Sequence, residues 1–225
     1  MKSFRILGLL LTYPEREMIA ALDEMESVLQ AECLLGRREL DSLQPLFTRL
    51  RSQDLLDLQA DYVHLFDRSR QLSLHLYEHL HGDSRGRGEA MTTLSTVYKL
   101  NGFELAANEL PDYLPLVCEF ASLIEEKAAR ALLADAVDTL AAMERCAQAR
   151  ETDYTAVFSV LIALSARTPD EEEIAAVLAG MASEPESLDE LDRDWEEEPV
   201  TFGPGAPSCS GLQNHGPSTM PGQEP

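Results

Sequence analysis

The stretch Gln71–Gly88 reads QLSLHLYEHLHGDSRGRG and holds three of the five histidines in the chain. Its residues Leu72, Leu76 and Leu80 recur every four positions, which is the spacing of one face of an amphipathic helix. Gly82 is expected to end that helix, because glycine favours the backbone conformation that closes a helix. The stretch therefore predicts a corner between two helices, where polar side chains and free backbone groups are presented together.

Three residues of this stretch also match a metal-enzyme motif. His75, Glu78 and His79 spell H-x-x-E-H, the inverted zinc-hydrolase pattern in which two imidazoles one turn apart bind zinc and the carboxylate is the general base. A catalytic site needs a third protein ligand, for which Glu104 and Glu109 are candidates. Histidine on a polar helix face more commonly serves as a hydrogen-bonding residue. No metal ligand is assigned, and a zinc hydrolase stays as the alternative function.

Residues 82–86 read GDSRG and match a second enzyme motif, G-x-S-x-G. In acyl-transfer enzymes this motif places a nucleophilic serine on a sharp turn that leaves a β-strand. Here the sequence predicts a helix before the serine, so the turn would lack its strand. The pattern is disfavoured relative to the zinc motif, and no catalytic residue is assigned.

Hydrophobic periodicity predicts helices along the rest of the chain. No segment shows sustained two-residue alternation between hairpin turns, so the predicted fold class is all-α, a single-domain helical bundle. Asp54 and Asp112 are predicted helix N-caps, and Pro45 is expected only within a first turn. The predicted helices cover residues 3–11, 14–35, 42–50, 54–66, 72–81, 88–101, 113–124, 128–149, 153–164 and 170–179.

Composition limits the classes of partner. The 18 basic residues stand against 40 acidic ones, which gives a formal net charge of −22. Binding to nucleic acid or to an anionic membrane surface requires a basic face, so both partners are disfavoured. Such acidity favours solubility, and it also attracts basic peptides over about 8–10 Å at ordinary salt. No apolar run approaches the roughly 18 residues of a membrane span.

The cysteines and the two ends of the chain indicate its organisation. Cys33, Cys118, Cys146 and Cys209 are scattered without C-x-x-C spacing, which favours reduced thiols and a cytoplasmic location. Residues 1–182 are expected to form the helical domain. Residues 183–225 are acidic and then rich in Gly, Pro and Ser, which predicts a disordered tail. Within it, the segment from Trp195 to Phe202 is interpreted as exposed linker or, alternatively, as a short docking segment.

Several blocks, taken in order, resemble a known family, the delta-subunit chaperones of respiratory nitrate reductase, also called nitrate reductase molybdenum cofactor assembly chaperones. The blocks are Leu10–Pro14 (LLTYP), Tyr62–Asp67 (YVHLFD), Leu72–Gly88, Glu109–Pro115 (ELPDYLP) and Trp195–Phe202 (WEEEPVTF). They run across most of the chain, and as an ordered set they are more specific than either enzyme motif.

The resemblance implies a chaperone, not an enzyme. It implies binding to the immature catalytic alpha subunit of membrane-bound nitrate reductase, at its N-terminal segment. The alpha subunit would be held in the cytoplasm until its molybdenum cofactor and iron–sulfur cluster are inserted, and membrane docking would follow. It implies no cofactor of the chaperone's own. A sister chaperone for another molybdoenzyme remains an alternative, and homodimer formation stays open.

The candidate client-binding residues belong to two predicted walls that would grip a basic amphipathic helix. Arg85 and Arg87 would orient the first wall through ion pairs. Helix capping by Asp83, Ser84 or Asp112 is an equally good interpretation of those residues. The first wall comprises His75, Glu78, His79, His81 and Asp83, and the second comprises Glu109, Asp112 and Tyr113.

Overall fold

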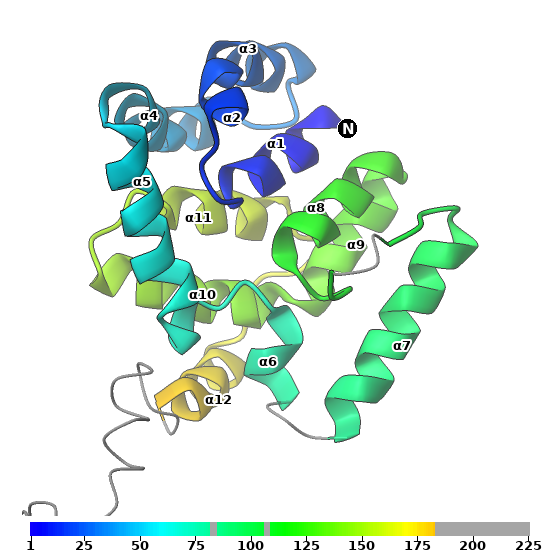
Figure 1. Ribbon diagram of the computed structural model, residues 1–225. Helices are drawn as coiled ribbons and strands as arrows, with labels where there is room; N and C mark the ends of the chain where they lie inside the picture. Colours follow the sequence, from blue (N-terminus) through cyan, green and yellow to red (C-terminus); the bar gives the residue numbers. More distant parts are fainter. Residues whose placement is uncertain (82–84, 106–108, 183–225) are drawn as a thin grey trace, which may run out of the picture.

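The structure is a computed structural model that describes residues 1–81, 85–105 and 109–182, and it confirms the all-α prediction (Figure 1). Its elements are α1 (Lys2–Leu10), α2 (Arg16–Ala20), α3 (Leu22–Glu32), α4 (Arg37–Ser52), α5 (Leu55–Tyr62), a π-helical turn η1 (Val63–Asp67), a 3₁₀ turn η2 (Arg70–Leu72), α6 (Leu76–His81), α7 (Arg85–Leu100), α8 (Leu114–Leu123), α9 (Glu126–Asp135), α10 (Val137–Ala149), α11 (Thr155–Leu164) and α12 (Glu171–Ala182).

The main core lies where helices distant in the sequence meet. α1 packs along α8, and α10 lies against both α11 and α12. Gly8 of α1 makes the first of these contacts possible, because a Cβ there would lie 2.8 Å from the Cβ of Cys118 and 2.9 Å from the carbonyl oxygen of Pro115. Burial raises the pKa of the Cys118 thiol to about 12, so this cysteine is a packing residue.

A smaller core attaches α7, which runs along one edge of the molecule (Figure 1). It consists of Leu94 and Tyr98 from α7 with Leu116 and Phe120 from α8. Tyr98 is fully buried, and its hydroxyl donates to the carbonyl of Pro111 at 2.8 Å. This contact ties α7 to the segment that precedes α8.

Two predicted helices are each divided in the structure. The helix predicted over residues 14–35 is broken at Ala21, between α2 and α3, and the one predicted over 128–149 is broken at Ala136, between α9 and α10. No Gly or Pro stands at either break, so local sequence provides no stop signal there. The predictions of single helices were wrong because tertiary packing sets these boundaries.

The start predicted for α4 was also wrong. This helix begins at Arg37 instead of near Ser42, and it holds Pro45 in its interior. Proline removes one intrahelical hydrogen bond, which leaves the carbonyl of Asp41 without an N–H partner. Asp41 and Pro45 are both exposed, so water can satisfy that carbonyl.

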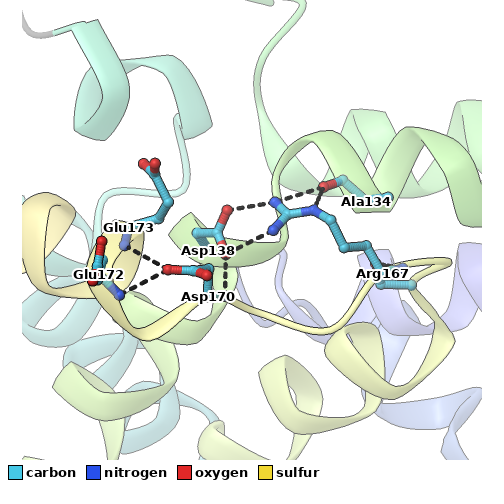
Figure 2. A network of polar contacts seen from close by, with 7 residues as sticks. Ala134, Asp138, Arg167, Asp170, Glu172 and Glu173 are labelled. Carbon is cyan, nitrogen blue, oxygen red and sulfur yellow. Dashed lines mark hydrogen bonds and ion pairs between the residues drawn. The ribbon is translucent and has the colours of Figure 1, made fainter.

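A polar network fixes the start of α12 (Figure 2). Arg167 pairs with Asp138 and donates to the carbonyl of Ala134 at 3.2 Å, at the end of α9. Asp138 also accepts from the N–H of Asp170 at 2.8 Å, and Asp170 in turn accepts from the N–H of Glu172 at 2.9 Å. Asp170 therefore caps α12, and the network joins that cap to α9 and α10.

Among the described residues, no helix combines the length and the apolar character that crossing a membrane requires.

Candidate functional site

The segments before α6 and α8 lie side by side. Residues His75 and Tyr113 form an isolated antiparallel bridge. The N–H of Leu76 donates to the carbonyl of Asp112 at 3.1 Å, and the N–H of Leu114 donates to the carbonyl of Leu74 at 2.8 Å. The rings of His75 and Tyr113 are tilted with their centroids 5.4 Å apart. The two predicted walls thus meet in direct contact.

Asp112 is the fully buried centre of this junction. Its carboxylate accepts from the N–H of Tyr77 at 3.1 Å, faces the Nδ1 atom of His75 at 3.4 Å, and lies 4.0 Å from Nη2 of Arg87. Because Tyr77 is in the first turn of α6, Asp112 caps α6 from 35 residues away in the sequence. The expected cap of its own following helix is wrong: the N-cap of α8 is Tyr113, without a side-chain hydrogen bond.

The surroundings of Asp112 favour its ionised form. Burial raises the pKa of this carboxyl, but the hydrogen bonds with His75 and the Tyr77 N–H and the charge of Arg87 together hold the pKa below its ordinary value. A carboxyl whose pKa is lower in the folded chain than in the unfolded chain stabilises the fold at every pH above its pKa in the unfolded chain. That contribution disappears as the pH falls through the folded value.

We therefore expect Asp112 to make the free energy of unfolding depend on pH, with a loss of stability on the acid side. The difference in free energy of unfolding between the wild type and Asp112→Asn should be constant at neutral pH and shrink as the pH falls below about 4, near the ordinary Asp pKa. Urea titrations at a series of pH values from 7 to 3 measure it. A difference that grows on acidification would contradict the ionised, stabilising role.

The other two residues of the H-x-x-E-H motif, Glu78 and His79, both contact Ser73. Ser73 Oγ donates to Glu78 at 2.6 Å, and Arg70 lies 3.9 Å from Glu78. His79 Nε2 is 2.7 Å from the carbonyl oxygen of Ser73, whereas His75 faces Asp112. Among residues 1–81, 85–105 and 109–182, no cluster of three or more His, Cys, Asp or Glu side chains is arranged to hold a metal ion. This geometry gives the zinc alternative no support.

A hollow of about 420 Å³, here called the polar hollow, opens beside this junction. It lies within the roughly 300–1,000 Å³ typical of ligand pockets. The π-helical turn η1 forms one side of it, and such turns occur frequently at functional sites. Its lining consists of Tyr62, Phe66, Asp67, Arg68, Ser69, Arg70, Ser73, Leu74, His75, Glu78 and Tyr113.

A second hollow of about 360 Å³, here called the apolar groove, lies between α7 and the pair α8 and α9. Val97 on its wall is 37% exposed, and Leu100 and Leu123, which adjoin the lining residues Asn101 and Ile124 in the sequence, are 81% and 65% exposed. Large apolar side chains left in contact with water beside a groove indicate an interaction surface. The lining comprises Leu76, Tyr77, Thr93, Leu94, Val97, Asn101, Val117, Phe120, Ile124, Ala128, Ala131, Leu132, Asp135 and Ala136.

The other predicted residues that the structure describes lie around the same corner. Glu109 is exposed and, with Tyr113, lines a third hollow of about 210 Å³. The backbones of His81 and Arg85 end α6 and begin α7, and their side chains are not described. Asp83 lies outside the described residues, as does Ser84 of the G-x-S-x-G motif. The structure therefore brings together His75, Glu78, His79, Arg87, Asp112 and Tyr113, and a binding role for each stays a prediction.

The sequence alone did not predict the apolar groove. Its walls come from four helices, and the contribution of α9 is mainly alanine, which also suits an ordinary solvated helix. Ala128 and Ala131 are exposed on α9 beside the partly buried Leu132. A face of small residues next to large apolar ones was the available signal.

Known proteins are similar to this chain over most of its length. The family model described as nitrate reductase delta subunit matches residues 35–159. The Escherichia coli K12 protein NarJ, a nitrate reductase molybdenum cofactor assembly chaperone, is 36% identical over 199 residues, which cover 88% of this chain and 83% of NarJ. NarW of the same strain, named a "probable nitrate reductase molybdenum cofactor assembly chaperone", is 31% identical over 90% of this chain and 84% of its own.

A solved structure supports the fold. The crystal structure of a "putative redox enzyme maturation protein" from Archaeoglobus fulgidus matches with a TM-score of 0.52 at 19% identity, and the match covers 72% of this chain and 91% of that one. At this identity the likeness concerns the fold alone. The family match over more than half of the chain and the coverage of NarJ show that this chain belongs to the nitrate reductase delta-subunit family.

Proposed function

We propose that this protein is an assembly chaperone that binds the immature alpha subunit of membrane-bound nitrate reductase at its N-terminal segment. It keeps that subunit competent for insertion of the molybdenum cofactor and the iron–sulfur cluster before membrane docking, and it makes or breaks no covalent bond itself. The names of the relatives support the assembly role. The feature of this chain that carries the proposal is the apolar groove on a strongly acidic protein.

The shape and charge of the groove suit an amphipathic helix with basic residues. Val97 and Leu132 present apolar surface for one face of such a helix. Glu125 precedes α9 and Asp135 ends it, and both are exposed. They lie roughly 15 Å apart along the helix, at 1.5 Å per residue. A client helix of about three turns could therefore place a cation near each end of the groove.

The junction around Asp112 joins this groove to the predicted walls. The N–H of Tyr77, a groove residue, and the ring of His75, a residue of the polar hollow, both contact the Asp112 carboxylate. We propose that Asp112 and Arg87 are positioning residues that hold α6. The exposed parts of Glu78, His79, Glu109 and Tyr113, together with His75, His81, Asp83 and Arg85, then form the polar surroundings of the bound segment.

A substitution that narrows the apolar groove tests whether the client binds there. Ala131 is exposed and lines the groove, so Ala131→Arg should place a long cationic side chain in the path of a basic helix without disturbing the core. We expect its affinity for a synthetic peptide of the alpha-subunit N-terminus to fall by about tenfold, or roughly 1.4 kcal/mol. Isothermal titration calorimetry measures this affinity.

Ala176→Arg is the matched control, because Ala176 is an exposed alanine of α12 and does not line the groove. Its affinity should equal that of the wild type. A scrambled peptide of the same composition controls for charge attraction alone. Equal affinities for Ala131→Arg and the wild type would exclude the groove as the client site, and equal binding of the scrambled peptide would exclude recognition of the segment.

A further inference from the structure

Two arginines, Arg68 and Arg70, line the polar hollow beside the carboxylates Asp67 and Glu78. Arg68 is exposed and has no ion-pair partner in the part of the chain that the structure describes. The side chain of Arg70 is 39% exposed. Arg150, which does not line the hollow, donates a hydrogen bond to Ser69 Oγ at 3.1 Å. Arg68 and Arg70 thus line one hollow in a chain of net charge −22, and Arg150 contacts the lining residue Ser69. Guanidinium groups bind carboxylates with good geometry, so Arg68 offers a ligand in this hollow a partner for a carboxylate.

The floor of the same hollow is aromatic. Phe66 lies between Tyr62 and Tyr154, with ring centroids 4.9 and 5.0 Å away. Tyr62, Phe66 and Tyr113 all line the hollow. The carboxylates in the lining are Asp67 and Glu78, and Glu78 is already engaged by Ser73 and Arg70. A ligand that combines carboxylates with an aromatic side chain therefore matches the lining.

The chain itself leaves the described region close to this hollow. Met181, in the last turn of α12, lies with its sulfur 3.9 Å from the sulfur of Cys146. Arg150 donates to the carbonyl of Cys146 at 3.3 Å through one nitrogen and to Ser69, a lining residue, through another. The capping network around Asp170 holds the other end of α12 (Figure 2). The end of α12 is therefore connected to the hollow through Cys146 and Arg150.

The sequence that follows carries the matching chemistry. Trp195 is the one tryptophan of the chain, and Glu196, Glu197 and Glu198 follow it directly, with Phe202 four residues later. Twelve residues separate Trp195 from Ala182, and such a spacer spans up to roughly 40 Å when extended. Closing a loop of this length is inexpensive, and the tether keeps the local concentration of the segment in the millimolar range.

We propose that the segment Trp195–Phe202 docks into the polar hollow of its own chain. Its glutamates pair with the exposed Arg68, and its aromatic side chains contact Tyr62, Phe66 and Tyr113. The docked segment covers His75 and Tyr113, so a client that contacts these residues has to displace it. Only this last consequence rests on the proposed function, because the docking is intramolecular and is measured without any client.

The fluorescence of Trp195 in the full chain reports the docking directly. Docking predicts blue-shifted emission and poor quenching by acrylamide. In Arg68→Glu, and separately in the triple variant Glu196→Gln, Glu197→Gln and Glu198→Gln, the ratio of docked to free segment should fall by about tenfold, because charge-assisted pairs are lost. Emission then shifts toward that of the urea-unfolded chain. High salt should act in the same direction.

Each variant has a matched control. Arg38→Glu makes the same change at an exposed arginine of α4 that likewise has no partner in the described part. In the tail, the triple variant Glu184→Gln, Glu186→Gln and Glu190→Gln removes the same charge outside the segment. Wild-type emission equal to that of the unfolded chain overturns the proposal, as do equal shifts in variants and controls. If the protection of Trp195 from acrylamide is lost on dilution, the segment docks into a second copy of the chain. That result overturns the proposal of an intramolecular contact.

Discussion

Replacing Asp112 with alanine is expected to lower the free energy of unfolding by about 3–5 kcal/mol, the range seen when one partner of a buried charge pair is removed. Asp112 is fully buried, and three groups share its carboxylate: the His75 ring, the Tyr77 N–H and the Arg87 guanidinium. Alanine removes the acceptor of all three and the cap of α6 at once. Urea unfolding followed by circular dichroism at pH 7 measures the change.

The control for this experiment is Asp41→Ala. Asp41 is exposed and pairs with Arg37 one turn away on α4 at 3.8 Å, a type of surface pair that contributes between 0 and about 1 kcal/mol. Asp112→Asn keeps the shape of the side chain and should lie between the two alanine variants. If Asp112→Ala costs no more than Asp41→Ala, Asp112 does not hold the junction between α6 and α8.

The substitution Gly8→Ala is expected to destabilise the fold by about 1–3 kcal/mol, the usual cost of overpacking, although alanine favours helix formation. The added Cβ would lie 2.8 Å from the Cβ of Cys118 and 2.9 Å from the carbonyl oxygen of Pro115. The oxygen belongs to the backbone, so a side-chain rotation cannot relieve the contact, and α1 has to move away from α8. Thermal or urea unfolding measures the loss.

Gly180→Ala is the same substitution in an open position. Gly180 lies in α12, and a Cβ there would meet nothing within 4 Å. Alanine should stabilise this variant by about 0.5–1 kcal/mol through helix propensity alone. The two variants should therefore differ in sign. A neutral or stabilising Gly8→Ala would mean that the contact between α1 and α8 is looser than the structure has it.

Local signals in the sequence predicted much of the helical fold. Asp54 caps α5, as expected, through a hydrogen bond from the N–H of Leu56 at 2.9 Å. The breaks at Ala21 and Ala136 were missed because they arise from packing between helices and not from Gly or Pro. The π-helical turn η1 was missed for a similar reason, since residues 63–67 continue the apolar pattern of α5.

The candidate site was only partly predictable for the same reason. The sequence placed His75, Glu78 and His79 at a helix corner, but the partner of His75 is Asp112, 37 residues away. Helical spacing relates residues three or four positions apart and carries no information about such a pair. The apolar groove likewise depends on how α7 sits against α8 and α9, which follows from the tertiary contacts of Leu94 and Tyr98.

The location of the client is tested most directly by crosslinking. A photoreactive amino acid is placed at Ala131, on the apolar groove, or at Ala176, on the exposed face of α12. The chain is then irradiated together with the N-terminal segment of the nitrate reductase alpha subunit. We predict a crosslink from position 131 to that segment and none from position 176. Binding of the segment with crosslinks from position 176 alone, or no binding at all, would contradict the account.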